Sequence, residues 1–176
     1  LASTVWVYGS SNIYTATKMA GEWLCRYYYE RYSQSFTILR YGIPYGPRAR
    51  DGLAISTFVK KALADEPITI FGKGNQFRNF LYVEDLAMGN ILAMQEIAEN
   101  KIYNIDGNKK ITIKEVIETI RRILNRNIKI KFRKPRSCDY FGTEVSSQNA
   151  KRELGWEPKV CLEEGLRRYI AWVKED

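Results

Sequence analysis

Apolar positions along the chain recur with two different periods, and the two periods alternate. Spacings of three and four residues predict helices at residues 14–32, 55–64, 86–98, 113–124, 147–154 and 162–173. Short runs of β-branched and aromatic residues predict a strand that ends at Tyr8-Gly9 and strands at residues 36–41, 68–71, 78–83, 102–105 and 128–133. Strands that alternate with helices are typical of an α/β protein with some parallel sheet.

Several residues mark where these elements begin and end. Thr112 and Glu115 have the spacing of a capping box, which predicts a helix that begins just after Thr112. Asp85 is placed to cap the helix predicted from residue 86. Glycine and proline interrupt residues 42–47, which are therefore predicted to be a loop. Gly72-Lys73-Gly74 follows a short strand without leading into a helix, so we interpret it as an ordinary turn.

The composition is that of a globular chain, and it limits which side chains could transfer protons or bind a metal. The 176 residues are 45% hydrophobic, which suits one substantial core. No apolar run approaches the roughly 20 residues of a membrane span, so we expect a cytoplasmic protein without membrane contacts. Three widely spaced cysteines fit neither a disulfide framework nor a zinc site. Because histidine is absent, proton transfer has to use Tyr, Lys, Asp, Glu or Cys, and no metal site is expected.

The net charge of +8 makes nucleic acid a candidate partner. Much of the basic surplus lies at residues 128–133, where apolar and basic side chains alternate strictly. This alternation predicts a strand with one face buried and one in water, and a charged outer face also protects a sheet edge. Because the sequence has no recognised nucleic-acid-binding motif, we favour the solvated edge and expect no nucleic-acid partner.

One short stretch combines three groups that can do chemistry. Thr4 supplies a hydroxyl in the first predicted strand, and Tyr14 and Lys18 are four residues apart on the following helix. That spacing places the phenol and the ammonium on one helix face, where the cation favours the phenolate and makes the phenol a usable base. The alternative is structural, because a tyrosine beside a solvated lysine is common on helices. The position just after a strand favours the chemical interpretation.

Five motifs distributed over the chain occur together. They are Ser3-Thr4 with Val7-Tyr8-Gly9, Tyr14-x-x-x-Lys18, Leu39-Arg40-Tyr41 with Pro44 and Gly46-Pro47, Arg78 to Asp85, and Glu153-Leu154-Gly155-Trp156-x-Pro158. Through them the chain resembles the extended short-chain dehydrogenase/reductases, in the branch of nucleotide-sugar epimerases and dehydratases, over essentially its whole length. The resemblance implies an α/β fold made of the C-terminal part of a Rossmann-like parallel sheet and a smaller α/β substrate-binding domain. Residues 1–45 and 79–106 would belong to the NAD-binding domain, and residues 46–78 and 107–176 to the nucleotide-sugar domain.

The resemblance also implies roles for residues that match the family's motifs. Tyr14 is implied to be the base that takes a proton from a sugar hydroxyl, and Lys18 to assist it and contact the nicotinamide ribose of NAD. Thr4 is implied to orient the reacting oxygen. Tyr41 and Pro44 are implied to contact the cofactor as well. The implied nucleotide-sugar contacts are Thr69, Ile70 and Phe71 at the base, Arg78 and Arg136 at the diphosphate, and Asp139.

Two residues bear on the reaction. In the dehydratase and decarboxylase relatives acidic residues follow the threonine, whereas here Val5 and Trp6 stand at these positions and cannot transfer protons. The resemblance therefore implies NAD-dependent epimerisation of a nucleotide sugar, most simply of UDP-glucose and UDP-galactose at C4, through a keto intermediate. Two alternatives stay open, namely a non-catalytic nucleotide-sugar-binding fragment and another dehydratase or reductase of the same family.

Part of the implied enzyme has no counterpart in this sequence. The family's glycine-rich phosphate loop and the acidic residue for the adenosine ribose are absent, so activity is expected to need an N-terminal half. Only residues 10–13 separate Gly9 from Tyr14, which is either a deletion or an omission of residues that border the sugar. Ile43 stands where many relatives have a substrate-contacting asparagine.

The aromatic run Tyr27-Tyr28-Tyr29 bears on assembly. The three tyrosine rings spread around too much of the helix circumference to be buried against one neighbour alone. We therefore expect a homodimer that forms through the Tyr14–Tyr32 helix.

Overall fold

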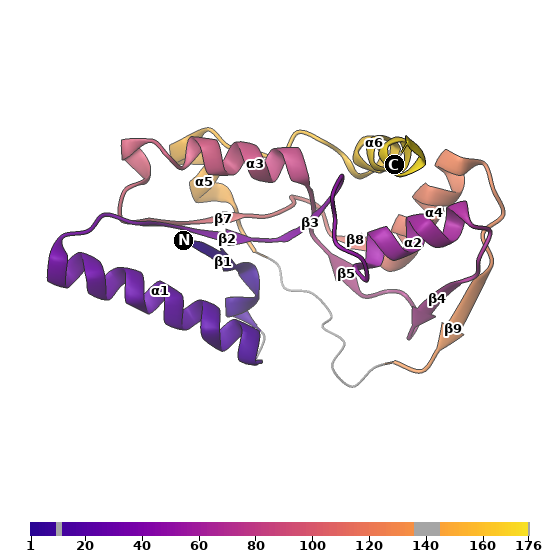
Figure 1. Cartoon of the computed structure of the whole chain (residues 1–176), viewed down its shortest axis with the longest axis horizontal. Helices are drawn as coiled ribbons and strands as arrows, with labels where there is room; N and C mark the ends of the chain where they lie inside the picture. Colours follow the sequence, from indigo (N-terminus) through magenta and orange to yellow (C-terminus); the bar gives the residue numbers. More distant parts are fainter. Residues whose placement is uncertain (10–11, 136–144, 176) are drawn as a thin grey trace.

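Figure 1 shows the computed structural model of the chain, in which residues 1–9, 12–135 and 145–175 are described. The central sheet has three parallel strands in the order β1 (Ala2–Thr4), β2 (Thr37–Tyr41) and β7 (Lys101–Ile105). Helix α1 (Ile13–Tyr32) lies on one face, and α3 (Val83–Leu92) and α5 (Gln148–Leu154) lie on the other. We term this part the sheet lobe. Parallel strands covered by helices on both faces confirm the predicted Rossmann-like arrangement.

The second part of the structure, termed the cavity lobe, packs helices against short strand pairs. Its elements are α2 (Ala54–Leu63), α4 (Ile113–Leu124), α6 (Leu162–Glu175), the parallel pair β4 (Ile68–Phe71) and β9 (Ile130–Arg133), and the antiparallel pair β5 (Phe77–Arg78) and β8 (Ile111–Thr112). Helix α4 buries Ile113, Val116, Ile117 and Ile120, which recur with helical spacing and therefore meet the core as one stripe. None of the helices in the described residues has the length and apolarity needed to cross a membrane.

The start of α4 confirms the predicted capping box. The Thr112 side-chain oxygen accepts a hydrogen bond from the Glu115 N–H at 3.1 Å, and a Glu115 carboxylate oxygen accepts one from the Thr112 N–H at 2.6 Å. Two of the donors that a helix start leaves without partners are thereby satisfied. The hydrogen bonds from the Thr112 backbone and side chain hold the pKa of the Glu115 carboxyl below its ordinary value.

A third strand pair joins the two lobes. Strand β3 (Ile43–Tyr45) pairs with β6 (Phe80–Tyr82) in parallel. Side chains alternate along a strand, so Phe80 and Tyr82 enter the core of the cavity lobe while Leu81 enters the core of the sheet lobe. This shared position explains why three consecutive residues of β6 are all buried.

A buried carboxyl group lies where β7 leaves the sheet lobe. Asp106 is 2% exposed, and its two oxygens accept hydrogen bonds from the Gly107 N–H at 2.9 Å and from the Asn79 amide at 3.0 Å. Gly42, between β2 and β3, leaves room for this carboxyl, because a Cβ at residue 42 would overlap it. Burial raises the pKa of Asp106 to about 6, although the hydrogen bonds from Asn79 and Gly107 oppose the change.

Polar side chains, not an apolar stripe, attach α1 to the sheet. Thr15 and Glu22 are the buried residues of this helix. Glu22 accepts hydrogen bonds from the Arg40 Nε at 2.9 Å, from the Arg40 Nη2 at 2.6 Å and from the Ser3 hydroxyl at 2.5 Å. Burial opposes ionisation of Glu22, but the hydrogen bonds from Arg40 and Ser3 outweigh it and hold the pKa of this carboxyl below its ordinary value.

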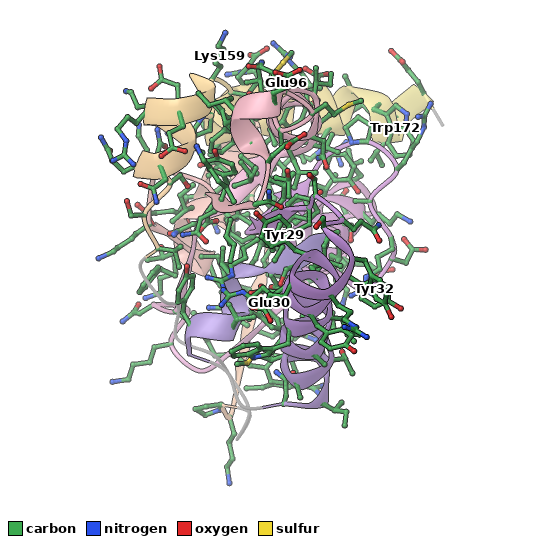
Figure 2. All side chains as sticks on the ribbon, turned by 90° about the vertical axis from the view of Figure 1, so that its left-hand side faces the viewer. Tyr29, Glu30, Tyr32, Glu96, Lys159 and Trp172 are labelled. Carbon is green, nitrogen blue, oxygen red and sulfur yellow. The ribbon has the colours of Figure 1, made fainter. Side chains whose placement is uncertain are left out.

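The large apolar side chains of α1 are exposed instead. The most exposed rings and aliphatic groups in its second half are those of Trp23, Leu24, Tyr27 and Tyr32, which are 54–64% exposed. Figure 2 shows Tyr32 of α1 and Glu96 on opposite sides of the sheet. The helical spacing of the apolar residues in α1 therefore does not mark a face that packs on this sheet.

Three predictions about secondary structure were wrong. The first strand ends at Thr4, and Val5–Tyr8 form a 3₁₀ helix, η1, because the Thr4 side-chain oxygen caps it. Residues 43–45 form β3 rather than a loop, since a strand with one neighbour tolerates Pro44, which lacks an N–H. The helix predicted over 86–98 instead spans Val83–Leu92 and is followed by a separate 3₁₀ turn, η2 (Glu96–Ala98).

Two further expectations were also corrected. Asp85 lies inside the first turn of α3, not at its cap, and a carboxylate oxygen accepts a hydrogen bond from the Val160 N–H at 2.9 Å. The alternation over 128–133 buries Ile128, but Phe132 at the end of β9 is 59% exposed. The apolar face of this segment therefore meets the core at Ile128 and Ile130 but not at Phe132, although Phe132 pairs with Ile70 of β4.

The C-terminal region contributes to both lobes. Helix α5 and Trp156 pack in the core of the sheet lobe, and the Trp156 indole donates a hydrogen bond to the Asp85 carbonyl at 2.9 Å. Helix α6, which follows, packs in the core of the cavity lobe. The division into residues 1–45 with 79–106 and 46–78 with 107–176 stays a prediction.

Candidate active site

Thr4 lies at the carboxyl end of β1, where open α/β sheets bind ligands. It is 6% exposed, and its side-chain oxygen accepts a hydrogen bond from the Trp6 N–H at 3.3 Å. Accepting this bond uses a lone pair and leaves the hydroxyl hydrogen for another acceptor. The hydroxyl is thus held in place by η1 while keeping the ability to donate.

Tyr14 and Lys18 share one face of α1, as their spacing predicts. The helix is capped by Asn12, whose side-chain oxygen accepts from the Thr15 N–H at 2.9 Å. The Lys18 ammonium lies 5.6 Å from the centre of the Tyr14 ring and donates a hydrogen bond to the Ala2 carbonyl of β1 at 3.1 Å. The Tyr14 side chain is half exposed. A cation and a phenol are therefore held together beside the end of β1.

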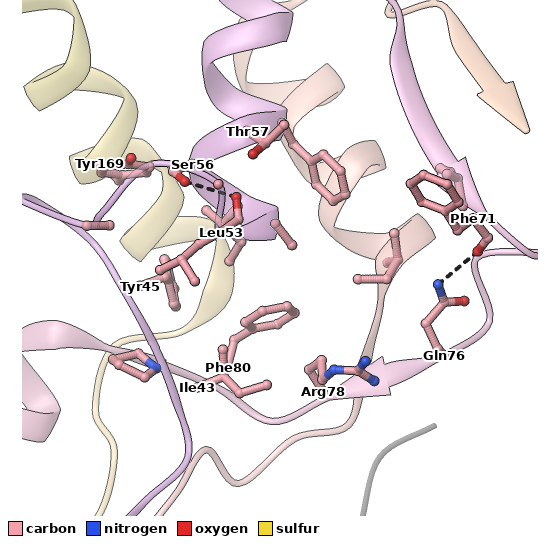
Figure 3. A pocket seen from close by; sticks show the side chains of 18 of the residues that line it. Ile43, Tyr45, Leu53, Ser56, Thr57, Phe71, Gln76, Arg78, Phe80 and Tyr169 are labelled. Carbon is pink, nitrogen blue, oxygen red and sulfur yellow. Dashed lines mark hydrogen bonds between the residues drawn. The ribbon is translucent and has the colours of Figure 1, made fainter. Parts of the chain in front are cut away.

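A cavity of about 390 Å³ opens in the cavity lobe (Figure 3). Its lining includes Pro44, Thr69, Ile70, Phe71 and Arg78, all of which the sequence predicts to be cofactor or substrate contacts. Figure 3 shows Phe71 and Gln76 at one side of the cavity and Leu53 and Tyr45 at the other, with Arg78 and Phe80 below. The Gln76 amide donates a hydrogen bond to the Phe71 carbonyl at 3.1 Å, which fixes the end of β4. A largely apolar cavity with a few placed polar groups is typical of a small-molecule site.

Trp6 connects this cavity to Tyr14. Trp6 is one of the residues that line the cavity, and its ring meets the Tyr14 ring edge to face, with 6.2 Å between the ring centres and 81° between the planes. Trp6 therefore links the cavity to Tyr14, although Thr4, Tyr14 and Lys18 do not line the cavity themselves.

The remaining predicted residues lie elsewhere. The Tyr41 hydroxyl donates a hydrogen bond to Asn90 of α3 at 2.5 Å, so this group faces α3. Burial raises the pKa of Tyr41 although the Asn90 hydrogen bond opposes the change. Arg136 and Asp139 lie outside the described residues.

Sequence reasoning did not assign Trp6, Gln76 or the first turn of α2 to the site. A signal existed for Trp6, which follows the predicted catalytic Thr4 by two residues. The sequence of α2 holds no comparable signal, because an apolar helix face has the same residue spacing whether it packs in a core or borders a cavity. Ile55 and Phe58 do both, since they are buried in the core and also line the cavity.

The comparisons with known proteins bear on this site. Residues 3–106 match the NAD dependent epimerase/dehydratase family. The chain belongs to this family. A curated relative, the UDP-glucuronate 4-epimerase of Thermodesulfobacterium geofontis, is 35% identical over 93% of this chain and 50% of its own length. The chain spans about half the length of the curated relatives it matches.

Solved structures of similar proteins share the fold of nearly the whole chain. The UDP-glucuronic acid 4-epimerase from Bacillus cereus, in complex with UDP-glucuronic acid and NAD, is 30% identical with a TM-score of 0.91, covering 99% of this chain and 60% of that protein. The UDP-glucose 4-epimerase from Thermotoga maritima, with UDP-glucose, is 27% identical with a TM-score of 0.92, covering 99% and 62%. These likenesses confirm the predicted family and fold class.

Proposed function

We propose that this chain is the substrate-binding and catalytic portion of an NAD-dependent nucleotide-sugar 4-epimerase, with UDP-glucose and UDP-galactose as the first substrates to test. One observation carries the proposal. Thr69, Ile70, Phe71 and Arg78 border the same cavity as Trp6, whose ring contacts Tyr14. A nucleotide held at β4 and Arg78 would therefore direct its sugar toward the phenol.

The chemistry of each site residue supports a role in this reaction. Tyr14, whose ring centre lies 5.6 Å from the Lys18 ammonium, takes the proton of the sugar hydroxyl and later returns it. Thr4 donates its hydroxyl hydrogen to the reacting oxygen and keeps it oriented. Arg78 binds the diphosphate, for which a guanidinium with several N–H donors is suited. Arg136 and Asp139 are proposed as further substrate contacts.

The residues at the end of β1 fit NAD as the cofactor. Lys18 has three donors, of which the Ala2 carbonyl receives one, so others can reach the ribose hydroxyls. Pro44, which lines the cavity, is proposed to border the nicotinamide. When bound, NAD supplies reversible oxidation of the sugar at C4. The phosphate-binding part of the cofactor site is proposed to lie in a further N-terminal half, consistent with the share of the relatives' length that this chain spans.

The direct test is an assay of the whole enzyme, expressed from the gene that carries this chain, with NAD and UDP-glucose. We expect UDP-galactose to form, and Tyr14→Phe to lower kcat by about 100-fold or more because the proton acceptor is lost. UDP-glucuronate and UDP-N-acetylglucosamine belong in the same panel, since similar proteins bear these names. Formation of a 4-keto-6-deoxy sugar nucleotide instead would contradict the proposal, as Val5 and Trp6 cannot transfer protons.

A binding fragment without activity is the second candidate, favoured by the cavity that lies within this chain. Calorimetry on residues 1–176 with UDP and with NAD tests the nucleotide site that both candidates share. UDP binding without NAD binding is expected for either candidate. Absence of UDP binding would contradict both. Turnover by the whole enzyme then decides between them.

We also propose a homodimer that forms through α1. Trp23, Leu24, Tyr27 and Tyr32 supply exposed apolar surface along this helix, which is more than scattered single residues require. Leu24→Lys should shift the sedimentation of the whole enzyme from dimer to monomer. Met94→Lys, at an 86% exposed residue beyond the end of α3, is the matched control. A dimer that persists in Leu24→Lys would count against this face.

A further inference from the structure

Trp6 occupies a fixed place between the proposed catalytic groups and the cavity. Its N–H donates to the Thr4 side-chain oxygen at 3.3 Å, and its carbonyl accepts from the Gly9 N–H at 3.2 Å. Both ends of the residue are thereby held by the short 3₁₀ turn that follows β1. The backbone of Trp6 is thereby fixed next to Thr4, and its half-buried indole extends from this turn.

The surroundings of the indole limit what it can contact. One edge meets the Tyr14 ring, and the side chain also lines the cavity that Arg78 and Phe71 border. A ligand whose charged part lies at Arg78 and whose reacting atom lies at Tyr14 has to pass Trp6. Under the proposed function, on which this inference rests, the part of the ligand at that point is the sugar ring.

We propose that Trp6 is a substrate-contact residue on which the sugar ring stacks. The C–H groups of a pyranose form an apolar face that an aromatic ring can bury, and such contacts add to affinity without directional hydrogen bonds. Substrate and product of an epimerase differ in the orientation of one hydroxyl. A flat apolar wall tolerates both orientations, whereas a hydrogen-bonding side chain at this place would favour one of them.

The alternative role for Trp6 is packing alone. A ring that only fills space between η1 and α1 would affect stability and the affinity of every ligand to a similar degree. A ring that stacks on the sugar would affect UDP-sugars and leave UDP, which has no sugar beyond its ribose, unchanged. The ratio of the two affinities therefore separates the roles.

The experiment uses the whole enzyme with NAD bound and Tyr14→Phe as background, so that added ligands are not turned over. Calorimetry gives Kd for UDP, UDP-glucose and UDP-galactose in this background and after Trp6→Leu or Trp6→Phe. Both substitutions keep an apolar side chain, but only phenylalanine keeps a flat ring. Phe132→Leu, at an exposed aromatic residue of β9 that does not line the cavity, is the matched control, and thermal melting checks that every variant folds.

Trp6→Leu is expected to raise the ratio of the UDP-sugar Kd to the UDP Kd about fivefold for both sugars, the size of an aromatic stacking contact. Trp6→Phe and Phe132→Leu should leave this ratio within about twofold. An unchanged ratio in Trp6→Leu would overturn this inference and leave the proposed function standing. Failure of the Tyr14→Phe enzyme to bind UDP would overturn the proposed function and this inference with it. If Trp6→Leu does not fold, Trp6→Met supplies the same comparison without a ring, and an unchanged ratio of the UDP-sugar Kd to the UDP Kd in it would overturn this inference.

Discussion

Helices α4 and α1 both carry apolar residues at helical spacing, but α4 gathers them on one face while α1 spreads large rings around its circumference, and their surroundings in the structure are opposite. Helix α4 buries five of its twelve residues, four of them isoleucine or valine. Helix α1 buries Thr15 and Glu22 among twenty. The cavity lobe thus contains the partners of its own helices, whereas the sheet lobe holds α1 through an ion pair and leaves its apolar side chains uncovered. Periodicity shows which side chains share a face, and the neighbours of that face decide whether it is buried.

The largest effect expected from this comparison is at Ile117. This residue is fully buried in α4, so Ile117→Ala should lower the free energy of unfolding by about 4 kcal/mol through lost burial and a cavity. Leu24→Ala, at a 58% exposed residue of α1, should change it by less than about 0.5 kcal/mol at concentrations too low for the proposed α1 dimer to form. Urea denaturation followed by tryptophan fluorescence measures both. Comparable losses in the two variants would mean that α1 is covered in solution.

The ion pair that attaches α1 gives the next effect. Glu22→Gln leaves Arg40 buried without its carboxylate, and we expect a loss of about 3 kcal/mol. Glu118→Gln removes a carboxylate that pairs with Arg121 at 2.8 Å but is 56% exposed, and should cost less than about 1 kcal/mol. Urea denaturation again gives both values. A small effect of Glu22→Gln would show that other contacts hold α1 to the sheet.

The Asp106 carboxyl between the lobes should make stability depend on pH. Its pKa of about 6 in the folded chain lies above the ordinary value of 3.8, so the folded chain binds this proton more tightly than the unfolded chain. The resulting stability is fully present below about pH 4 and is lost as the pH rises through about 6, by about 3 kcal/mol.

Asp106→Asn should remove this pH dependence. The Asn79 side-chain oxygen is buried without a hydrogen-bond partner among the described residues, so it can accept from the new amide if Asn79 turns over. Urea denaturation between pH 4 and pH 8 measures the slope, with the exposed Asp51→Asn as control. An unchanged slope in Asp106→Asn would assign the titration to another group.

The smallest effect is expected at the start of α4. Thr112→Ala removes the side-chain oxygen that caps the helix and should cost about 1 kcal/mol. Thr112→Ser keeps an oxygen at the same place and should cost less than half as much. Thermal melting can resolve this difference. Equal losses in the two variants would mean that the methyl group, not the cap, matters.

Local chemistry in the sequence predicted much of the fold. The capping box at Thr112, the strand at residues 68–71 and the amphipathic stripe of α4 depend on neighbouring residues, and the structure confirms them. The first strand was placed too far along because Val5 and Val7 favour strands, whereas the Thr4 side chain instead caps a 3₁₀ turn. The burial of β6 on both sides depends on two cores that only the tertiary structure brings together.

The candidate site was predictable only in part for a related reason. The spacing of Tyr14 and Lys18 is a local property, so one shared helix face followed from it. That Trp6 and Phe71 border one cavity depends on how two lobes pack, which no local pattern encodes. Tyr41 shows the same limit, because its motif gives no indication that its hydroxyl meets Asn90 on α3.

The way the chain passes between the lobes restricts how this protein can be divided. It leaves the sheet lobe after β2, returns through β6, leaves again after β7, returns with α5 and ends in the cavity lobe with α6. A single proteolytic cut therefore cannot separate the lobes into two complete pieces. Recombination between related genes would need several crossovers to exchange one lobe, so the two halves of the site are inherited together.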